Sequence, residues 1–504
     1  MTDSSWMTPG QREAMERFRS FISSDDETVF VLRGYAGTGK TTLLRSFVDY
    51  ISDLGALYVL AASTGRAAKM LTLRTGMEAQ TLHSLIYHFH RFGDSIKDLL
   101  EDEKEEHRHP LSDEDPAEEM LSLFSASTIS DDERQWGLRV YFIDEASMIS
   151  DRETKGGMLS FGSGNVLADL FKYDPEGKFV FVGDDSQLPP VGQDYSPALV
   201  PEYMEMLYDV RATGCQLTEI VRQDSQSGIV LAAADIRALY LDPPEVKWGT
   251  LPLKGYDDIV ICNDQETLVS DYLTAIGDKD FDRCTFISLS NKRCAEVSRR
   301  ARELYGYMAP VEVDDLLLVT QNDLTTGLAN GDLIEVLEVS LSRKRVRGGV
   351  TFVPVRVRNI DDSAEYETLL ILDLLEQDAP GLSSADYKAL YRDFAVRMRK
   401  EGTKPGSRGF RKSLREDPYL NALHCRYGYA LTCHKAQGGE WPEVFIDLPV
   451  WLMKEPKSEA YRWVYTALTR ARSVAHLAKS FVIKNHRRHT IFITVRPEKS
   501  NLLA

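Results

Sequence analysis

A β-prone run followed by a glycine-rich loop near the N-terminus constrains the fold of this chain most. Residues 29–32 (VFVL) are β-prone, and residues 34–41 (GYAGTGKT) fit the pattern G-x-x-x-x-G-K-[ST]. Apolar residues then recur with helical spacing up to residue 51. Glycines let backbone N–H groups converge on phosphate oxygens, and the start of a helix adds partial positive charge. The sequence therefore predicts a phosphate-binding loop between a strand and a helix.

The residues of this loop have separate expected roles. Lys40 is expected to neutralise the β- and γ-phosphates of ATP, and Thr41 to place its hydroxyl on Mg²⁺. An ordinary glycine-rich turn is the alternative, but such a turn does not require the full pattern in its strand, loop and helix context. The other loop residues expected to bind the nucleotide are Gly34, Gly37, Thr38, Gly39 and Thr42.

Two further apolar runs end in polar side chains. Residues 140–143 precede Asp144 and Glu145, and residues 178–182 are followed by Gln187 after a short turn. Continuous apolar runs are typical of strands buried on both faces of a parallel sheet. We expect Asp144 to hold hydrated Mg²⁺, Glu145 to polarise the attacking water, and Gln187 to hydrogen-bond a terminal phosphate oxygen. Surface acids and a polar turn after a core strand are the alternatives.

The C-terminal part of the chain repeats the α/β pattern without a second phosphate-binding loop. Residues 426–431 and 444–446 are predicted strands, and residues 462–477 follow a helical pattern that carries Arg470. Two α/β cores with one phosphate-binding loop favour a single ATP site in the cleft between them. Arginines of the second core can then reach the γ-phosphate and stabilise transition-state charge.

The charge of the chain is unevenly distributed. A formal net charge of −17 by itself argues weakly against binding to a phosphate backbone. Between residues 94 and 133, however, fifteen Asp and Glu residues accompany three Lys and Arg, and residues 392–415 and 479–499 are basic. Local charge, not net charge, governs docking to nucleic acid. The composition therefore leaves a nucleic-acid partner open.

Cysteine usage and hydropathy indicate the compartment. The six cysteines are scattered without a Cys-x-x-Cys pair, which disfavours a disulfide framework or a zinc finger. The chain has no apolar run of about 18 residues and no signal-peptide pattern at its N-terminus. We expect a cytoplasmic protein with no membrane partner.

Short segments spread over nearly the whole chain resemble the superfamily 1 helicases of the B branch, the RecD-like group, and most closely the phage Dda type. The combination of QLPPVG with LTEIVRQ is the RecD-like form. Ser63 and Ala436 are small departures, since proline and serine are common at these positions. The matching segments are TPGQREAM, GYAGTGKTT, LAASTGRAAKML (Leu60–Leu71), AQTLHSLIY (Ala79–Tyr87), FIDEASM, GDDSQLPPVG, LTEIVRQ (Leu217–Gln223), LTCHKAQGGEW and VYTALTRAR (Val464–Arg472).

The resemblance implies roles for individual residues. Gln11 would read the adenine, Arg222 and Arg470 would contact the γ-phosphate, and Gly438 would bind the nucleotide, with Gln437-Gly438 as the link to nucleotide state. Cys433 is expected to be a small buried residue, not a catalytic thiol. Without the surrounding motif, His83 or His434 would more often be a structural histidine than a DNA contact. The residues implied to line the single-stranded DNA track are Thr64, Arg66, Thr81, His83, Thr432 and His434.

The resemblance also implies a domain organisation: two RecA-like parallel-sheet cores, a small 1B insert and an SH3-like, β-rich 2B insert. The 1B insert would carry a hairpin that splits the duplex, with an aromatic wedge drawn from Tyr87, Phe89, Phe92 or Phe124. The predicted divisions are residues 1–86 and 137–230 for domain 1A, 87–136 for 1B, 231–307 and 424–504 for domain 2A, and 308–423 for 2B with a basic extension.

The function implied is an ATP- and Mg²⁺-dependent DNA helicase that translocates on single-stranded DNA, in the 5′-to-3′ direction by the family branch. Its partners would be single-stranded DNA, duplex or forked DNA, and other replication or recombination proteins. One alternative is an ATP-regulated clamp on single-stranded DNA that never unwinds duplex. Others are the helicase subunit of a RecBCD-like complex, an RNA-acting enzyme and an unrelated P-loop ATPase.

Overall fold

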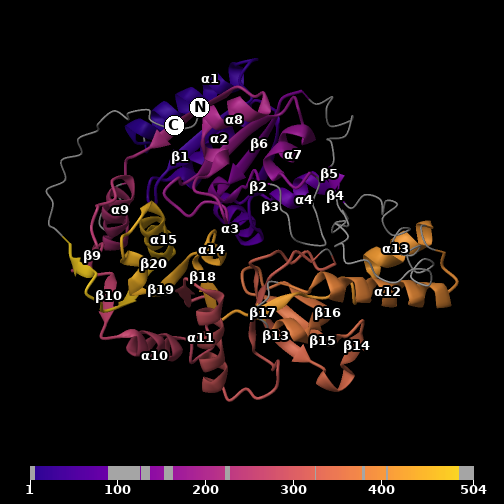
Figure 1. Cartoon of the computed structure of the whole chain (residues 1–504). Coiled ribbons are helices and arrows are strands. Elements are labelled where there is room, and N and C mark those ends of the chain that lie inside the picture. The colour runs from indigo at the N-terminus through magenta and orange to yellow at the C-terminus, as the bar shows by residue number, and fades with distance from the viewer. Residues whose placement is uncertain are drawn as a thin grey trace, which may run out of the picture.

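The computed structural model describes residues 6–88, 125–126, 137–152, 163–221, 227–323, 325–376, 381–404 and 407–486. Three larger sheets organise these residues (Figure 1). Two of the sheets are parallel throughout, and the third is antiparallel. The described residues therefore confirm the predicted α/β class with two parallel-sheet cores and a β-rich part.

The first parallel sheet has the strand order β3-β2-β6-β7-β1-β8. Its strands are β1 (Val29–Gly34), β2 (Leu57–Ala62), β3 (Ala79–Thr81), β6 (Arg139–Asp144), β7 (Lys178–Gly183) and β8 (Ala212–Leu217). The helices around it are α1 (Pro9–Ser23), α2 (Lys40–Asp53), α3 (Gly65–Thr75), α4 (Leu82–Ile86), α7 (Val166–Tyr173) and α8 (Pro201–Tyr208).

Apolar side chains on both faces of this sheet explain why its strands are continuous apolar runs. On one face, strand residues pack with α1 and α2, where the rings of Phe18 and Phe47 stack 4.0 Å apart. On the other face, strand residues pack with α4, α7 and α8. Helices on both faces are the consequence of the crossover connections that parallel strands require.

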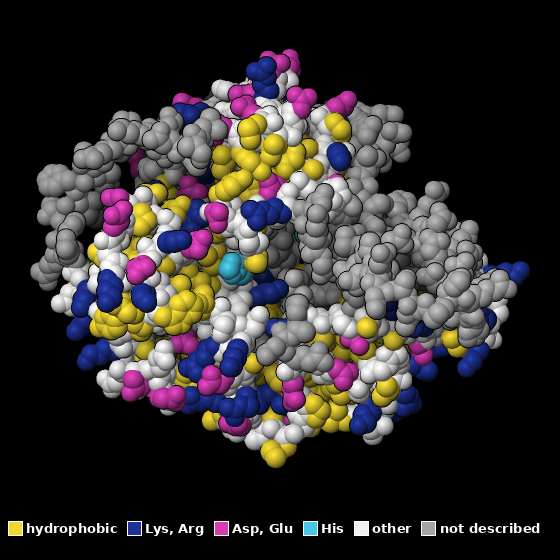
Figure 2. Space-filling model, viewed as in Figure 1, with side chains coloured by type: hydrophobic (Ala, Val, Ile, Leu, Met, Phe, Trp, Pro, Cys, Tyr) yellow, Lys and Arg dark blue, Asp and Glu magenta, His cyan; other side chains and the backbone are white. Residues whose placement is uncertain are grey.

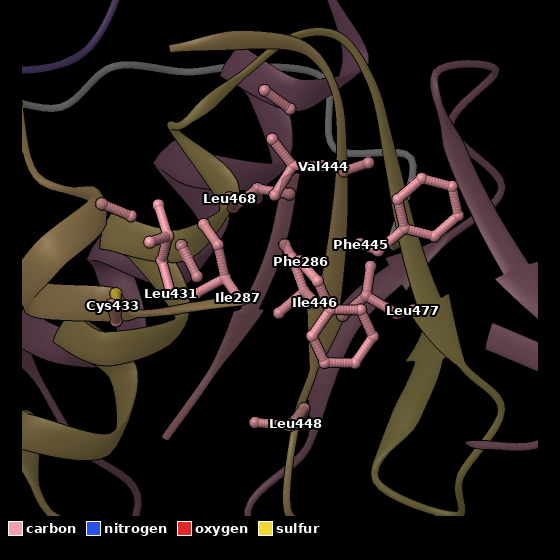
Figure 3. Packing of buried hydrophobic residues seen from close by; sticks show 14 of the residues in the cluster. Phe286, Ile287, Leu431, Cys433, Val444, Phe445, Ile446, Leu448, Leu468 and Leu477 are labelled. Carbon is pink, nitrogen blue, oxygen red and sulfur yellow. The ribbon is translucent and has the colours of Figure 1, made fainter. Parts of the chain in front are cut away.

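The second parallel sheet has the strand order β10-β20-β19-β11-β18. Figure 3 shows part of its core, where buried side chains of the neighbouring strands β11 and β19 include Phe286, Ile287, Val444 and Ile446. The strands are β10 (Ile259–Cys262), β11 (Cys284–Ser288), β18 (Ala430–Thr432), β19 (Trp441–Asp447) and β20 (Ala471–Ala478), with β9 (Leu251–Lys254) and β21 (Ile483–Asn485) paired separately. The helices are α9 (Gly228–Leu241), α10 (Gln265–Ala275), α11 (Asn291–Leu304), α14 (Cys433–Ala436) and α15 (Ser458–Leu468).

The antiparallel sheet has the order β14-β15-β13-β12-β17, with β16 paired to β15. Its strands are β12 (Leu316–Val319), β13 (Leu333–Val339), β14 (Arg345–Arg347), β15 (Val350–Asn359), β16 (Glu365–Ile371) and β17 (Cys425–Tyr427). Two helices, α12 (Ser384–Lys400) and α13 (Arg408–Glu416), extend to one side of this sheet (Figure 1). A separate short ladder joins β4 (Tyr87–His88) to β5 (Ser125–Ala126).

Two local predictions were wrong. The strand predicted over residues 426–431 is two strands, because β17 pairs with β12 while β18 pairs with β11 in the other sheet. The helical pattern predicted over residues 462–477 holds only for α15, because residues 471–478 form β20, which pairs with β10 and β19. The predicted basic extension contains α12 and α13, and the N-cap Ser407 of α13 accepts a hydrogen bond from the Phe410 N–H.

Candidate nucleotide and nucleic-acid site

A cleft of about 690 Å³ lies between the two parallel sheets. In the first sheet β6, β7 and β1 are neighbours, so the loops at their carboxyl ends meet at one edge. Most of the predicted nucleotide-site residues meet there. Those that line the cleft are Gly37, Gly39, Lys40, Thr41, Thr42, Asp144, Glu145, Gln187 and Arg470.

The phosphate-binding loop closes around the Lys40 ammonium. The Lys40 Nζ atom donates to the carbonyl of Gly34 at 2.7 Å and to that of Tyr35 at 3.1 Å. Gly39 has a φ of 76°, and a Cβ added there would lie 2.6 Å from Nε2 of Gln11. A Cβ on Gly34 would lie 2.7 Å from the Thr38 hydroxyl. The loop is therefore built for residues without side chains at these two positions.

Gln11 supports this loop from outside the cleft. Its Nε2 donates to the Thr38 carbonyl at 3.1 Å, and its Oε1 accepts the Thr8 N–H at 3.0 Å. Thr8 and Gln11 together cap α1, and Gln11 is 2% exposed. Gln11, Gly34 and Thr38 thus shape the loop without lining the cleft, so the adenine-reading role of Gln11 stays a prediction.

Asp144 and Glu145 lie at the end of β6. The Asp144 Oδ1 atom accepts the Glu145 N–H at 2.9 Å. Burial, reinforced by the adjacent Glu145 charge, raises the pKa of Asp144 to about 6. A buried carboxylate beside a second acid is stabilised by a bound cation, which is the environment a divalent metal site requires.

The segment from Asp184 to Leu188 links the first sheet to the second. Gln187 is 5% exposed, and its Oε1 has no hydrogen-bond partner. The Leu188 N–H donates to the Thr466 hydroxyl at 2.9 Å, and the Leu188 carbonyl accepts from Gln437 Nε2 at 2.9 Å. Two side chains of the second core therefore hold the backbone next to Gln187, which lines the cleft.

Two side chains of α15 complete this contact and were not singled out from the sequence. The Tyr465 hydroxyl donates to Asp184 Oδ2 at 2.6 Å and accepts the Ala36 N–H at 3.0 Å. Arg462 donates to the Asp194 carbonyl at 2.6 Å and to the Asp185 carbonyl at 2.9 Å. The three-residue spacing of Arg462 and Tyr465 puts them on one helix face, a signal that the sequence did contain.

Arg470 reaches the cleft from just beyond α15. Its guanidinium donates to the Thr466 carbonyl at 3.1 Å and to the Gly439 carbonyl at 3.2 Å, and the residue is 3% exposed. These bonds fix a cation at the cleft edge, as expected of an arginine that contacts a γ-phosphate. The second predicted arginine, Arg222, lies outside the described residues.

An ion pair that the sequence did not reveal crosses the cleft. Arg74, near the end of α3, lies 2.5 Å from the Glu440 carboxylate of the second core. Both residues line the cleft. Helix α3 therefore extends from the segment of the predicted DNA track at Thr64 to the nucleotide cleft at Arg74.

The predicted threonines of the DNA track lie at helix starts. Thr64 and Thr81 cap α3 and α4 by accepting the N–H groups of Ala67 and Ser84 at 3.2 and 3.1 Å. Thr432 occupies the N-cap position of α14 without such a bond. Gly438, predicted to bind the nucleotide, lies instead against α3, where an added Cβ would meet the Thr64 hydroxyl at 3.1 Å. The two DNA-track segments of the two cores are thus in contact.

Arg66 does not have the exposed position expected of a DNA contact. It is 5% exposed, its guanidinium lies 4.0 Å from the Trp441 ring, and it pairs with Asp361 at 3.4 Å. One turn further along α3, Lys69 pairs with Asp332 at 3.0 Å and with Asp362 at 3.1 Å. Carboxylates from turns of the antiparallel sheet therefore pair with both Arg66 and Lys69, which a local sequence pattern cannot indicate.

The remaining predicted residues have buried or partly buried surroundings. Burial lowers the pKa of His83, and burial together with Lys435 lowers that of His434. Tyr87 is a core residue whose hydroxyl donates to Asp169 at 2.9 Å, so it is unsuited to be the wedge. The other wedge candidates, Phe89, Phe92 and Phe124, lie outside the described residues.

Cys433 is buried, as predicted. Figure 3 shows its sulfur at the end of a core strand near Leu431, and burial raises the pKa of its thiol to about 12. Across the described part of the chain, no group of three or more His, Cys, Asp or Glu side chains could hold a metal ion.

Charges of both signs are mixed on the surface that Figure 2 shows, with Lys and Arg gathered in the lower part near α11. No helix among the described residues has the length and hydropathy needed to cross a membrane. In the described part of the chain, a cleft that is lined by a phosphate-binding loop and lies between two parallel-sheet cores is typical of a P-loop NTPase with two cores.

Comparison with known proteins narrows this class. The model of the AAA domain family matches residues 6–239, and that of the UvrD-like helicase C-terminal domain matches residues 427–478. The chain is similar to the ATP-dependent DNA helicase dda of Enterobacteria phage T4, with 27% identity over 46% of this chain and 42% of the relative. It is also similar to the ATP-dependent RecD2 DNA helicase of Deinococcus radiodurans, with 25% identity over 88% of this chain and 46% of the relative. These matches confirm the predicted resemblance to superfamily 1B, RecD-like helicases.

The chain spans less than half the length of the curated relatives it matches. One of them, an uncharacterized protein of Methanocaldococcus jannaschii, is 23% identical over 94% of this chain and 38% of its own length. Among solved structures, a Pif1 helicase from Bacteroides in complex with ADP-AlF3 and single-stranded DNA aligns over 94% of this chain and 92% of that chain, with 17% identity and a TM-score of 0.46.

Proposed function

We propose that this chain is an ATP-dependent DNA helicase that translocates on single-stranded DNA, 5′-to-3′, and unwinds duplex ahead of it. The observation that carries the proposal is the composition of the cleft. One sheet contributes the phosphate-binding loop, Asp144 and Gln187, and the other contributes Arg470. A nucleotide bound between two cores stabilises their closed arrangement. The cores open again after hydrolysis, and this cycle of closing and opening produces movement.

The residues of the cleft fit ATP and Mg²⁺. The glycine positions of the loop leave room for phosphate oxygens, and Lys40 would exchange two backbone carbonyls for the β- and γ-phosphates. Thr41 and Asp144 would hold Mg²⁺, which supplies charge neutralisation when bound. The unpartnered Oε1 of the buried Gln187 is suited to a hydrogen bond with the attacking water or a phosphate hydroxyl.

Hydrolysis would depend on three side chains. Glu145 would accept a proton from the attacking water, and Arg470 and Arg222 would stabilise the charge that develops on the phosphoryl oxygens. Arg470 is preorganised by two backbone carbonyls, so little rearrangement is needed at the moment of reaction.

Coupling to the strand would use the contacts between the cores. Leu188 is bonded to Thr466 and to Gln437, and Tyr465 joins the phosphate-binding loop to Asp184. A change in the cleft therefore displaces the segment of Thr432 and His434 relative to that of Thr64 and Thr81. Alternating grip by the two segments would advance single-stranded DNA in steps.

Replacing the loop lysine tests the assignment. We expect Lys40→Ala to abolish DNA-stimulated ATP hydrolysis and strand displacement without changing the circular dichroism spectrum, because the phosphates lose their counter-charge. Lys172→Ala, which removes an exposed lysine from α7, is the matched control. Substrates with 5′ or 3′ tails measure polarity in the same assay, and normal unwinding by Lys40→Ala would sink the proposal. ATP hydrolysis by the parent protein without displacement of either substrate would favour the clamp.

The second core is tested at Arg470. We expect Arg470→Ala to bind ATP with near-normal affinity but to hydrolyse it at least roughly 100-fold more slowly, since its guanidinium acts on transition-state charge. Single-turnover hydrolysis and nucleotide titration separate the two effects. Arg299→Ala on α11 is the control for loss of an exposed arginine. Unchanged turnover would remove Arg470 from the mechanism.

A further inference from the structure

A second cavity, of about 460 Å³, lies between the first parallel sheet and the antiparallel sheet. Its walls come from α3, β3 and α4 on one side and from the β12–β13 turn and α12 on the other. In Figure 1 this is the region between the upper core and the β-rich part with its two helices. The cavity is separate from the nucleotide cleft, with which it shares no lining residue.

Flat rings form much of the wall. His83 and Tyr87 line the cavity from α4 and β4, and Tyr387 and Tyr391 line it from α12. The ring of His424 lies nearly parallel to that of Tyr387, with centroids 6.0 Å apart and an interplanar angle of 15°. Aromatic walls of this kind suit a flat aromatic ligand, because stacking needs only a π-face.

Two buried polar atoms in this wall have no partner. His424 is 6% exposed and Asp323 is 8% exposed, and both line the cavity. Neither Nδ1 of His424 nor Oδ2 of Asp323 makes a hydrogen bond. The other carboxylate oxygen of Asp323, in contrast, accepts the N–H groups of Thr325 and Thr326 at 2.7 and 3.2 Å. Unpaired buried polar atoms are costly, so this pair indicates a ligand with complementary groups.

The walls are fixed by close packing between the two sides. A Cβ added to Gly65 would lie 2.1 Å from the Cβ of Ala329, so α3 meets the β12–β13 turn at a distance that only glycine allows. Beside it, Lys69 pairs with Asp332 and Asp362. The cavity is therefore preformed, and its ligand need not order it.

We propose that this cavity holds one nucleobase of the bound strand, and that it favours a base with an exocyclic amino group. The amino group would donate to Asp323 Oδ2, a ring nitrogen or carbonyl would bond His424 Nδ1, and Tyr387 would stack on the base. Cytosine, adenine and guanine carry this group and thymine does not. The proposal rests on the proposed function, because Thr81 and His83, two implied strand contacts, also line the cavity.

The proposal is tested by removing one base at a time from a bound oligonucleotide. Fluorescence anisotropy measures the affinity of the whole protein for 12-nucleotide oligo(dC), in which one abasic site is moved position by position. We expect one position at which loss of the base weakens binding roughly tenfold, against small effects elsewhere. Tyr387→Ala should flatten this profile, whereas Tyr387→Phe and Val396→Ala, on the exposed side of α12, should keep it.

Asp323→Asn provides an independent variant of nearly unchanged shape. It should remove the preference for oligo(dC) over oligo(dT) while keeping binding to oligo(dT), because the amide nitrogen at the Oδ2 position donates and cannot accept from the amino group of a base. Millimolar deoxycytidine should not displace the oligonucleotide; displacement would indicate a site for a free nucleoside instead. If the affinity of the parent protein is the same at every position of the abasic site while DNA-stimulated ATP hydrolysis is intact, the nucleobase pocket is overturned and the helicase proposal stands. No DNA binding at all would overturn both.

Discussion

Asp144 and Glu145 are adjacent in sequence but have different backbone settings. Asp144 ends β6 in extended backbone, whereas Glu145 has a φ of 50°, in the left-handed region that non-glycine residues rarely occupy. Such strain is concentrated at functional sites, where the surrounding structure holds it. At the scale of single residues, the strained backbone of Glu145 and the unpaired Oε1 atom of Gln187 mark the cleft as a functional site, as its sequence motifs do.

His424 gives a prediction on stability. Burial lowers its pKa to about 4, below the ordinary value of 6.5, so the folded protein favours the neutral ring. The unfolded chain binds the proton first, and the free energy of unfolding should therefore fall as the pH drops from 6.5 to 4, by up to about 3 kcal/mol. Urea denaturation at pH 7 and pH 4.5 measures this, with His424→Gln as the variant that lacks the titration. An equal pH dependence in both proteins would contradict the assignment.

Helix α3 is the element that joins the two predicted sites. Its N-cap Thr64 faces Gly438, its first turns contact the antiparallel sheet, and Arg74 in its last turn pairs with Glu440 across the nucleotide cleft. Because a helix is rigid, a small displacement of one end of α3 also moves its other end. The C-terminal segment of the same helix is buried against the sheet by Leu71.

The Arg74–Glu440 ion pair should therefore affect coupling more than catalysis itself. We expect Arg74→Gln to keep basal ATP hydrolysis within a few-fold but to lower its stimulation by single-stranded DNA roughly tenfold, because closure of the cleft loses a partly buried charge pair. Steady-state hydrolysis with and without oligo(dT) measures both quantities. The exchange Arg74→Glu with Glu440→Arg should restore stimulation, and failure of this rescue would argue against the pair.

At the scale of the whole molecule, the antiparallel sheet is docked on the first core through charge. Asp361, Asp362 and Asp332 surround Arg66 and Lys69 on α3. Although burial opposes it, pairing with Asp332 and Asp362 raises the pKa of Lys69. The acids thus neutralise Arg66 and Lys69.

Removing these acids should change DNA binding in a measurable way. We expect Asp361→Asn with Asp362→Asn to tighten binding to oligo(dT) and to steepen its dependence on salt by about one to two phosphate contacts, since Arg66 and Lys69 each lose a neutralising carboxylate. Affinities between 50 and 300 mM KCl give the slope. Glu365→Gln with Glu367→Gln on the exposed part of β16 is the charge-matched control. If the two double variants show the same dependence of affinity on salt, Asp361 and Asp362 do not limit DNA binding.

Much of the nucleotide site was predictable because it depends on local chemistry. The phosphate-binding loop, Asp144, Glu145 and Gln187 each follow an apolar strand, and parallel strands bring their carboxyl ends to one edge. Tyr465, Arg462, Arg74 and Glu440 were missed because their partners are distant in the chain. The environment of Arg66 was misjudged for the same reason: its partner Asp361 lies in a turn of another sheet.

The sequence by itself determined the two α/β cores, the single phosphate-binding loop and the burial of Cys433, since hydrophobic pattern and backbone requirements are encoded within short segments. Tertiary structure alone decided which side chains face each other across the cores. It also decided that a strand splits at Gly428 between two sheets, that carboxylates cover the cations of α3, and that His424 and Asp323 share a cavity. These features depend on contacts between residues far apart in the chain, and such contacts leave no periodic mark on the sequence.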